Sequence, residues 1–317
     1  MTIIICKVQS GMCNRLIPFI TSYRLAMNLN LKYYLNWNNE CSDITYSYKG
    51  VKTTYNDMFQ NIDHVNYIND NQLQTLLNNK KIITINYCKT DMEKYTTDNL
   101  LQYDIIFFNR YVHPIFTKED NVTIPNYSAI DWVVSDNNYL KDIQKYFKLL
   151  KPATDIQNKI NEVLTLFPED NNIIAIHIRH WHRQFFTDKM HLDLMSGNQE
   201  KRIQFIKDEL NKNSNTKFFI SSTDKTAIDD IIERFGENKI IYFKNRFGET
   251  FDDKYYISNS NNSSSNIYKN KNGVVDLFLL SKCKNIIGDV GSSYSLCGPL
   301  LNNNTSYIPI KVVDYKL

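Results

Sequence analysis

Asn172-Ile-Ile-Ala-Ile-His-Ile-Arg-His180 is an apolar run that ends in imidazole and guanidinium side chains. Its length and its β-branched residues predict a buried strand. Side chains alternate between the faces of a strand, so His177 and Arg179 share one face and the isoleucines around them share the other. Ligands bind outside the carboxyl ends of strands in open parallel sheets. Arg179 is therefore placed to meet an anion, unless it only marks where a core strand reaches solvent.

The second half of the chain alternates between predicted strands and predicted helices. The strands cover 172–178, 217–221, 239–243, 284–288 and 306–310, and the helices cover 199–211, 225–235, 273–283 and 294–302. Strict alternation predicts a parallel, doubly wound α/β sheet. The low-complexity segment 258–266, which is rich in Ser and Asn, is predicted to be a flexible loop.

The first half is less regular. The predicted strands cover 2–8, 32–36, 81–87 and 104–109, and the predicted helices cover 15–29, 139–149 and 153–166. Tyrosine- and asparagine-rich stretches between them show no clean period. The length of 317 residues allows two domains, which we place at 1–150 and 151–317.

Composition excludes several classes of protein. A hydrophobic content of 42% indicates globular cores, and a formal net charge of +3 is too small to favour nucleic acid as the main partner. The chain has no run of about eighteen apolar residues, so no membrane span is predicted. The six cysteines form no Cys-x-x-Cys pair, which favours free, buried thiols and a reducing, cytoplasmic location.

A second candidate element, Gly288-Asp-Val-Gly-Ser-Ser-Tyr-Ser295, follows a predicted strand and opens a helix. Backbone N–H groups and the helix dipole favour an anion there, and Ser292 and Ser293 can donate hydroxyl hydrogen bonds. The alternative is a simple serine N-cap. Together with Arg179, this element predicts a diphosphate site between a guanidinium and a helix terminus.

Acidic residues provide further candidates. Asp276 is predicted in the first turn of an apolar helix, where it would complement the helix dipole. If it is buried instead, it needs a partner, and its carboxylate could accept hydrogen bonds from N1–H and the amine of guanine. Thr223 and Asp224 follow the strand 217–221, and an N-cap role is the favoured explanation for them.

Other patterns argue against metals and dinucleotides. The N-terminal turn has neither a dinucleotide fingerprint nor a P-loop; Gly11 would allow a tight turn, with Asn14 and Arg15 facing the cleft between domains. The histidine cluster, His177, His180, His182 and His191, lacks a zinc-ligand pattern. The chain contains no Asp-x-Asp, so we expect no metal and no cofactor. Protein groups would then have to offset the charge of a leaving diphosphate.

These motifs resemble, in order and spacing, those of the GDP-fucose-dependent fucosyltransferase superfamily. The resemblance rests on His177-Ile-Arg179, Ser222-Thr-Asp224, and Asp276 followed by Gly291-Ser-Ser-Tyr-Ser295, with Gly11-Met-Cys-Asn14 similar to the N-terminal turn of the family. It implies a GT-B-like enzyme with two Rossmann-like domains facing a central cleft. The C-terminal domain would bind the donor, and the N-terminal domain would contact a glycan or protein acceptor.

The resemblance also implies residue roles. Arg179 matches the arginine on the β-phosphate, His177 and Asp276 match guanine contacts, and Gly291, Ser292 and Ser293 belong to the phosphate-binding turn. Thr223 and Asp224 match the second nucleotide motif, and Gly11 and Asn14 match the turn at the cleft. Transfer would be inverting and metal-independent.

The sequence departs from the family at His180, where many members have a second arginine. Because of this change, the resemblance specifies the fold more closely than it specifies the donor sugar or the type of acceptor. Asp188, His180 and His182 are candidate general bases. Three alternatives stay open: a transferase for another nucleotide-sugar, a catalytically silent nucleotide- or glycan-binding protein and, more weakly, a metalloenzyme that uses the histidines.

Overall fold

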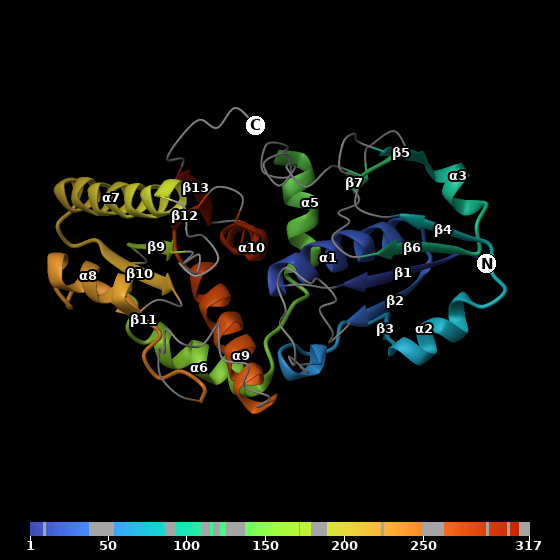
Figure 1. The fold of residues 1–317 in the computed structure, drawn as a ribbon, viewed down its shortest axis with the longest axis horizontal. Helices are drawn as coiled ribbons and strands as arrows, with labels where there is room; N and C mark the ends of the chain where they lie inside the picture. Colours follow the sequence, from blue (N-terminus) through green and yellow to red (C-terminus); the bar gives the residue numbers. More distant parts are fainter. Residues whose placement is uncertain are drawn as a thin grey trace. The chain divides into compact units, whose positions relative to one another are not determined.

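The computed structural model divides the chain into two compact units (Figure 1). The first comprises Met1–Ala153 with Asn261–Asn270, and the second comprises Thr154–Ser260 with Lys271–Leu317. The structure describes residues 1–8, 11–37, 54–85, 93–109, 115–116, 121–124, 137–170, 172–178, 189–222, 225–248, 263–289, 292–302 and 305–310.

A five-stranded parallel sheet forms the centre of the second unit. Its strands are β9 (Ile173–Ile178), β10 (Lys217–Ser222), β11 (Ile240–Tyr242), β12 (Asn285–Asp289) and β13 (Ser306–Ile310). They lie in the order β11-β10-β9-β12-β13, and every pair is parallel. The chain therefore runs outward from β9 in one direction and then returns to add strands on its other side.

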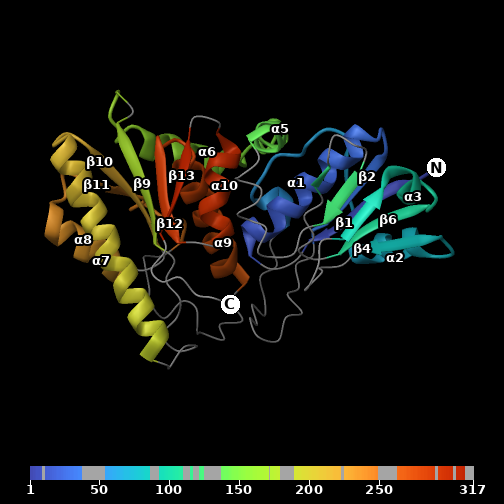
Figure 2. The ribbon, with the colours of Figure 1, turned by 90° about the horizontal axis from the view of Figure 1, so that it is seen from above.

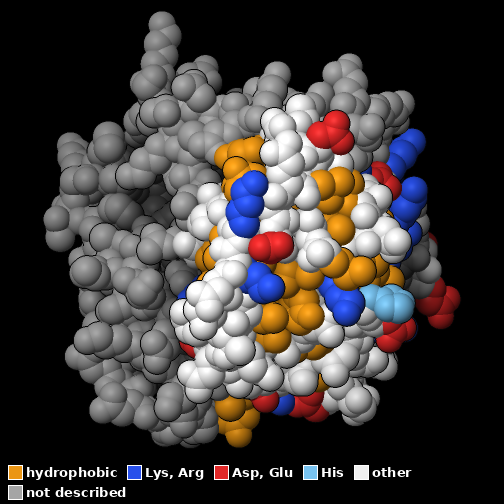
Figure 3. Space-filling model, turned by 90° about the vertical axis from the view of Figure 1, so that its right-hand side faces the viewer, with side chains coloured by type: hydrophobic (Ala, Val, Ile, Leu, Met, Phe, Trp, Pro, Cys, Tyr) orange, Lys and Arg blue, Asp and Glu red, His pale blue; other side chains and the backbone are white. Residues whose placement is uncertain are grey.

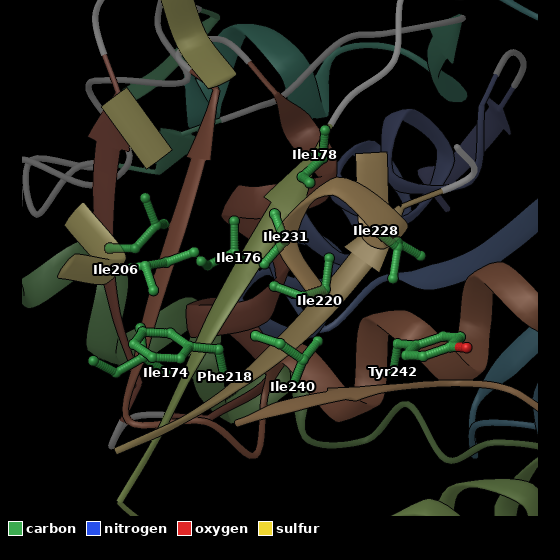
Figure 4. Close-up of a cluster of buried hydrophobic side chains, with 11 residues drawn as sticks. Ile174, Ile176, Ile178, Ile206, Phe218, Ile220, Ile228, Ile231, Ile240 and Tyr242 are labelled. Carbon is green, nitrogen blue, oxygen red and sulfur yellow. The ribbon is translucent and has the colours of Figure 1, made fainter. Parts of the chain in front are cut away.

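Helices cover both faces of this sheet (Figure 2). They are α6 (Thr154–Leu164), α7 (Lys189–Lys212), α8 (Lys225–Phe235), α9 (Ser263–Leu280) and α10 (Ser293–Leu301). Ile174, Ile176 and Ile178 pack with Ile206 of α7 and Ile228 of α8 in one buried cluster (Figure 4). The predicted alternation of β9 is thus confirmed, and each buried isoleucine contributes about 1.5–3 kcal/mol.

The first unit also contains a five-stranded parallel sheet, with the order β3-β2-β1-β6-β4. Its strands are β1 (Ile3–Val8), β2 (Lys32–Trp37), β3 (Val65–Tyr67), β4 (Ile82–Ile85) and β6 (Ile105–Asn109). A small antiparallel sheet contains β5 (Glu93–Thr96), β7 (Ile115–Phe116) and β8 (Asn121–Ile124). The predicted class, α/β with parallel sheets, is confirmed.

The helical elements of the first unit are α1 (Met12–Asn28), the short 3-10 helix η2 (Tyr55–Asp57), α2 (Asp70–Leu77), α3 (Thr97–Leu101) and α5 (Asn137–Phe147). Helix α1 is almost entirely buried: Ser22 hydrogen-bonds Tyr33 of β2, and Arg24 pairs with Asp142 of α5. On the opposite face of the sheet, Leu73 of α2 packs on Ile5 and Ile105.

The surface of the first unit carries both signs of charge. Figure 3 shows lysine and arginine side chains next to aspartate and glutamate, with hydrophobic side chains scattered between them. This mixture agrees with the small net charge of the chain. No helix among the described segments has the length and apolar character needed to cross a bilayer.

Predictions about two helices of the second half were wrong. Helix α7 begins at Lys189, ten residues before the predicted start at 199. Helix α9 begins at Ser263, ten residues before the predicted start, so 263–266 are helical and not loop, whereas 258–262 lie outside the described residues. Serine and asparagine are only moderately poor helix formers, and the apolar run that follows carries the helix through them. The same shift places Asp276 deep inside α9 and not in its first turn, so it cannot serve the helix dipole.

Gly298 offers a test of the packing between α10 and β12. A Cβ atom at Gly298 would lie 2.1 Å from Cδ1 of Ile286, which is fully buried. We expect Gly298→Ala to lower the free energy of unfolding by about 1–2 kcal/mol, because overpacking outweighs the better helix propensity of alanine. Adding Ile286→Val removes Cδ1 and should restore most of the lost free energy of unfolding. Urea unfolding measures both changes.

Gly11→Ala is the matched control, because nothing lies within 4 Å of the added Cβ and the backbone has φ −62°. Its free energy of unfolding should stay within about 0.5 kcal/mol of wild type. A Gly298→Ala protein as stable as the control would show that the helix does not lie against Ile286.

Candidate functional site in the second unit

The order of strands in the second unit locates the site. The order in which strands are added to the sheet reverses between β9 and β12, and ligands bind at the carboxyl ends of strands at such a switch point. Register places His177 opposite Ser221 and Ile178 opposite Ser222 at that edge. Ser292, which follows β12 in the sequence, lies at the same edge because β9 and β12 are parallel neighbours.

His177 is held against the first turn of α10. Its side chain lies on the face of β9 opposite the isoleucine cluster, and only 8% of the residue is exposed. Its Nδ1 lies 2.7 Å from Oγ of Ser295, and its ring lies 4.9 Å from the ring of Tyr294. The Tyr294 hydroxyl in turn donates to the carbonyl of Gly273 in α9. His177 therefore joins β9, α10 and α9.

The serines at the start of α10 have different roles. Ser292 is the N-cap and is buried; its side chain accepts a hydrogen bond from the backbone N–H of Ser295 at 3.5 Å. The cap alternative is thus confirmed for Ser292. Ser293 is the first helical residue and is half-buried. The role of Ser295 was not predicted, although its spacing from the cap was visible in the sequence.

Asp276 is a buried carboxylate with one cationic partner. It is 4% exposed, and its Oδ2 lies 2.9 Å from Nη2 of Arg246, in the loop after β11. Nη2 of Arg246 also donates to the carbonyl of Ser222, at the end of β10, at 3.3 Å. The requirement that a buried Asp276 should have a partner is therefore met, by a residue that sequence reasoning missed.

We call the second oxygen of Asp276 open because it lacks a hydrogen-bond donor among the described residues, although it is buried. In the described part of the chain, Oδ1 is buried and has no hydrogen-bond partner. Burial raises the pKa of Asp276, and the charge and hydrogen bond of Arg246 act against that rise. A buried acceptor that lacks a donor costs about 1–3 kcal/mol. A ligand that presents an N–H group would remove that cost.

Helix α9 also fixes the loop that carries Arg246. The side chain of Asn272 accepts from the backbone N–H of Phe247 at 2.8 Å and donates to the carbonyl of Phe247 at 3.1 Å. The guanidinium of Arg246 lies 5.4 Å from the centre of the Phe243 ring. No periodic or spacing signal marks Asn272 or Arg246, because their partners are backbone groups and a carboxylate distant in sequence.

The N-terminal turn differs from its prediction. Helix α1 begins at Met12, so Asn14 lies in its first turn, and Gly11 is the N-cap with an extended backbone that any residue can adopt. Arg15 is buried, with its guanidinium 5.3 Å from the centre of the Trp37 ring. Pro18 lies within α1 and removes the helical hydrogen bond to the carbonyl of Asn14.

Several predicted site residues lie outside the described residues: Arg179, His180, His182, Asp188, Thr223, Asp224 and Gly291. His191 lies on the described backbone of α7, but its side chain is not described. Within the described ranges, no group of His, Cys, Asp and Glu side chains could hold a metal ion.

Comparison by sequence finds no matching family model and no matching curated protein. Solved structures do match. NodZ alpha-1,6-fucosyltransferase soaked with GDP-fucose has a TM-score of 0.59 at 12% identity, covering 95% of this chain and 93% of that chain. A variant of Arabidopsis thaliana FUT1 in complex with GDP has a TM-score of 0.55 at 9% identity, covering 96% and 70%. POFUT1 in complex with GDP-fucose has a TM-score of 0.52 at 11% identity, covering 97% and 98%.

The chain has the fold of these fucosyltransferases. The match runs over almost its whole length, so the predicted GT-B-like class and the resemblance to this superfamily are confirmed at the level of the fold. Identities near one residue in ten carry no information on individual side chains. The activity and the roles of individual residues therefore have to be inferred from the geometry of the site.

The contact between Asn272 and Phe247 can be tested by substitution. Asn272→Ala removes two hydrogen bonds to a backbone that remains partly buried, so we expect the free energy of unfolding to fall by about 1–3 kcal/mol. Amide exchange in 244–248 should become faster. The control is Asn245→Ala, which removes an exposed contact to Glu162 and should change stability by less than about 0.5 kcal/mol. Equal exchange in the two variants would contradict the proposed anchoring.

Proposed function

We propose that this protein is an inverting, metal-independent glycosyltransferase that moves fucose from GDP-fucose to a hydroxyl group of a glycan or protein. The observation that carries the proposal is the open Oδ1 of buried Asp276, near the switch point of a doubly wound sheet. Guanine presents N–H donors on one edge, N1–H and the amine, and an ionised carboxylate is their natural acceptor. The three neighbouring structures contain GDP or GDP-fucose.

The diphosphate would lie at the N-terminus of α10. The partial positive charge of that helix end, the hydroxyl of half-buried Ser293 and the turn at Gly291 would contact its oxygens. Arg179, one residue beyond the end of β9, would add a full positive charge. His177, fixed by Ser295 and Tyr294, would line the nucleoside side, with Thr223 and Asp224 after β10.

The reaction would be a direct displacement at the anomeric carbon. The acceptor oxygen forms a bond to C1 as the bond between C1 and the β-phosphate oxygen breaks, with inversion at C1. GDP leaves with the bonding electrons, and the acceptor proton passes to a general base among His180, His182 and Asp188, or to the leaving phosphate. Arg179 and the helix terminus would stabilise the charge on that phosphate.

A hydroxyl acceptor would be bound mainly by the first unit, near Gly11 and Asn14. The space around the Gly11 Cβ position favours close approach of a ligand. Four described cysteines, Cys6, Cys13, Cys283 and Cys297, are buried and form no disulfide bond, and burial raises the pKa of Cys6 to about 11. Buried cysteines without a disulfide bond support a reducing compartment, the cytoplasm.

Nucleotide binding tests the role of Asp276. Asp276→Asn keeps the size of the side chain but loses the ionised acceptor, so GDP affinity should fall about tenfold to a hundredfold, equivalent to roughly 1–3 kcal/mol. Isothermal titration of GDP, UDP and dTDP measures it. Tighter binding of UDP than of GDP by wild type would favour the alternative, a transferase for another nucleotide-sugar.

Transfer from labelled GDP-fucose tests the role of Arg179. Arg179→Lys keeps one positive charge and Arg179→Ala removes it, so we expect kcat to fall by about 10²-fold and more than 10³-fold, respectively, with smaller changes in GDP affinity. EDTA should leave wild-type activity unchanged. Full activity of Arg179→Ala would refute the proposed mechanism, and GDP binding without transfer or hydrolysis would identify a silent binding protein.

A further inference from the structure

The pair Asp276–Arg246 has an unusual environment for charges. The two side chains are only 6% and 9% exposed, and the flanking residues of α9, Val274, Val275 and Leu277, are fully buried and apolar. In such surroundings an isolated carboxylate takes up a proton. A protonated carboxyl offers one fewer acceptor site and adds a donor, so it would oppose the N–H donors of a base.

Arg246 is itself fixed from several directions. Its Nη2 bridges Oδ2 of Asp276 and the carbonyl of Ser222, and its guanidinium lies near the ring of Phe243. The next residue, Phe247, is anchored to Asn272 through both backbone groups. Helix α9 thus holds the carboxylate and also the backbone next to its cation, which sets the geometry of the pair.

The pairing leaves the two carboxylate oxygens unequal. Oδ2 accepts from Arg246, whereas Oδ1 is buried with no donor in the described residues. Rotation of the carboxylate would break the bond to Nη2. Arg246 therefore selects which oxygen stays open.

We infer that Arg246 is a positioning residue for base recognition: it keeps Asp276 ionised inside the apolar site and holds Oδ1 open for an N–H donor of the nucleotide base. This inference rests on the proposed function. Arg246 acts through Asp276 and makes no contact with the base itself. Arg246 lies outside the sequence motifs, so this inference adds a cationic residue to those involved in base recognition.

Other polar and charged groups in the described part of the site are already engaged. His177 hydrogen-bonds Ser295 and packs against Tyr294, whose hydroxyl donates to Gly273. Lys271, on α9, pairs with Asp155 of α6. Among the groups that shift the pKa of Asp276, Arg246 is the charged one, and it opposes the upward effect of burial. The shift of the pH dependence between wild type and an Arg246 variant is therefore diagnostic of Arg246.

The test is GDP affinity of the full chain between about pH 5 and about pH 9, because the apparent pKa of Asp276 sets the pH at which binding is lost. Wild type should lose affinity as pH falls through that pKa. Arg246→Met should move the loss to higher pH, so that affinity near neutral pH drops by about tenfold or more but recovers in alkaline solution. Arg246→Lys should lie between the two.

The matched control is Arg234→Met. Arg234 also contacts an aspartate of the same unit, Asp230, at 2.8 Å, but its side chain is 46% exposed. Its pH profile should equal that of wild type. A uniform loss of affinity at every pH in Arg246→Met would indicate a merely structural role and overturn the inference, as would an unchanged profile.

Stability measurements without nucleotide separate this inference from the proposed function. Because the pKa of Asp276 is raised in the folded state, the folded protein binds an extra proton between the unfolded and folded pKa values. The contribution of Asp276 to stability therefore falls as pH rises through that window. This contribution is the free energy of unfolding of wild type minus that of Asp276→Asn, measured at each pH. When both proteins also carry Arg246→Met, its fall should extend to higher pH.

If the contribution of Asp276 falls over the same pH range with Arg246 and with Arg246→Met, the inference about Arg246 is overturned even if GDP binds. If wild type binds no GDP at any pH, the proposed function fails instead. An extended window would then still support the effect of Arg246 on the ionisation of Asp276, while its role in recognition of a base would fall with the function.

Discussion

The site of the second unit depends on one constraint: a carboxylate placed within the apolar second half of helix α9 must be neutralised by a neighbour. Arg246 meets this demand, but only because the loop after β11 is anchored to the same helix through Asn272. A buried pair of this kind is weak evidence for added stability, since desolvation of both charges offsets their attraction. What the pair does in this structure is to fix the direction of an acceptor oxygen, Oδ1 of Asp276.

Helix α9 is consequently more than a cover for the sheet. Within five residues, Asn272 to Asp276, it contacts the loop after β11, the start of α10 through Gly273, and Arg246, which in turn reaches the end of β10. Strand β9 joins the same network through His177 and Ser295. Hydrogen-bond networks in low dielectric are strong when complete and costly when one member lacks a partner. Oδ1 of Asp276 is such a member.

Much of the fold could be predicted from the sequence because its signals are local. The runs around Ile174, Phe219 and Ile287 are apolar and short, the helix at 225–235 ends at Gly236, and the structure has strands and a helix there. The start of α9 was missed because Ser and Asn have weak helix preferences and no periodicity. Arg246 and Asn272 were missed for a different reason: their partners lie 30 and 25 residues away, and only the folded chain brings them together.

The cores of the two units differ in composition. The second unit packs isoleucines, which carry no polar atoms. The first places tyrosines in its core, and each hydroxyl then needs a partner: that of Tyr33 hydrogen-bonds Ser22 and that of Tyr23 donates to the carbonyl of Asp63. Burial raises the pKa of both hydroxyls, so they act as neutral donors. In the second unit, Arg246 is the partner of one oxygen of the buried Asp276 carboxylate, and the other oxygen has no partner among the described residues. A neutral hydroxyl can donate to a backbone carbonyl, whereas a buried carboxylate needs a donor, which Arg246 supplies to Asp276.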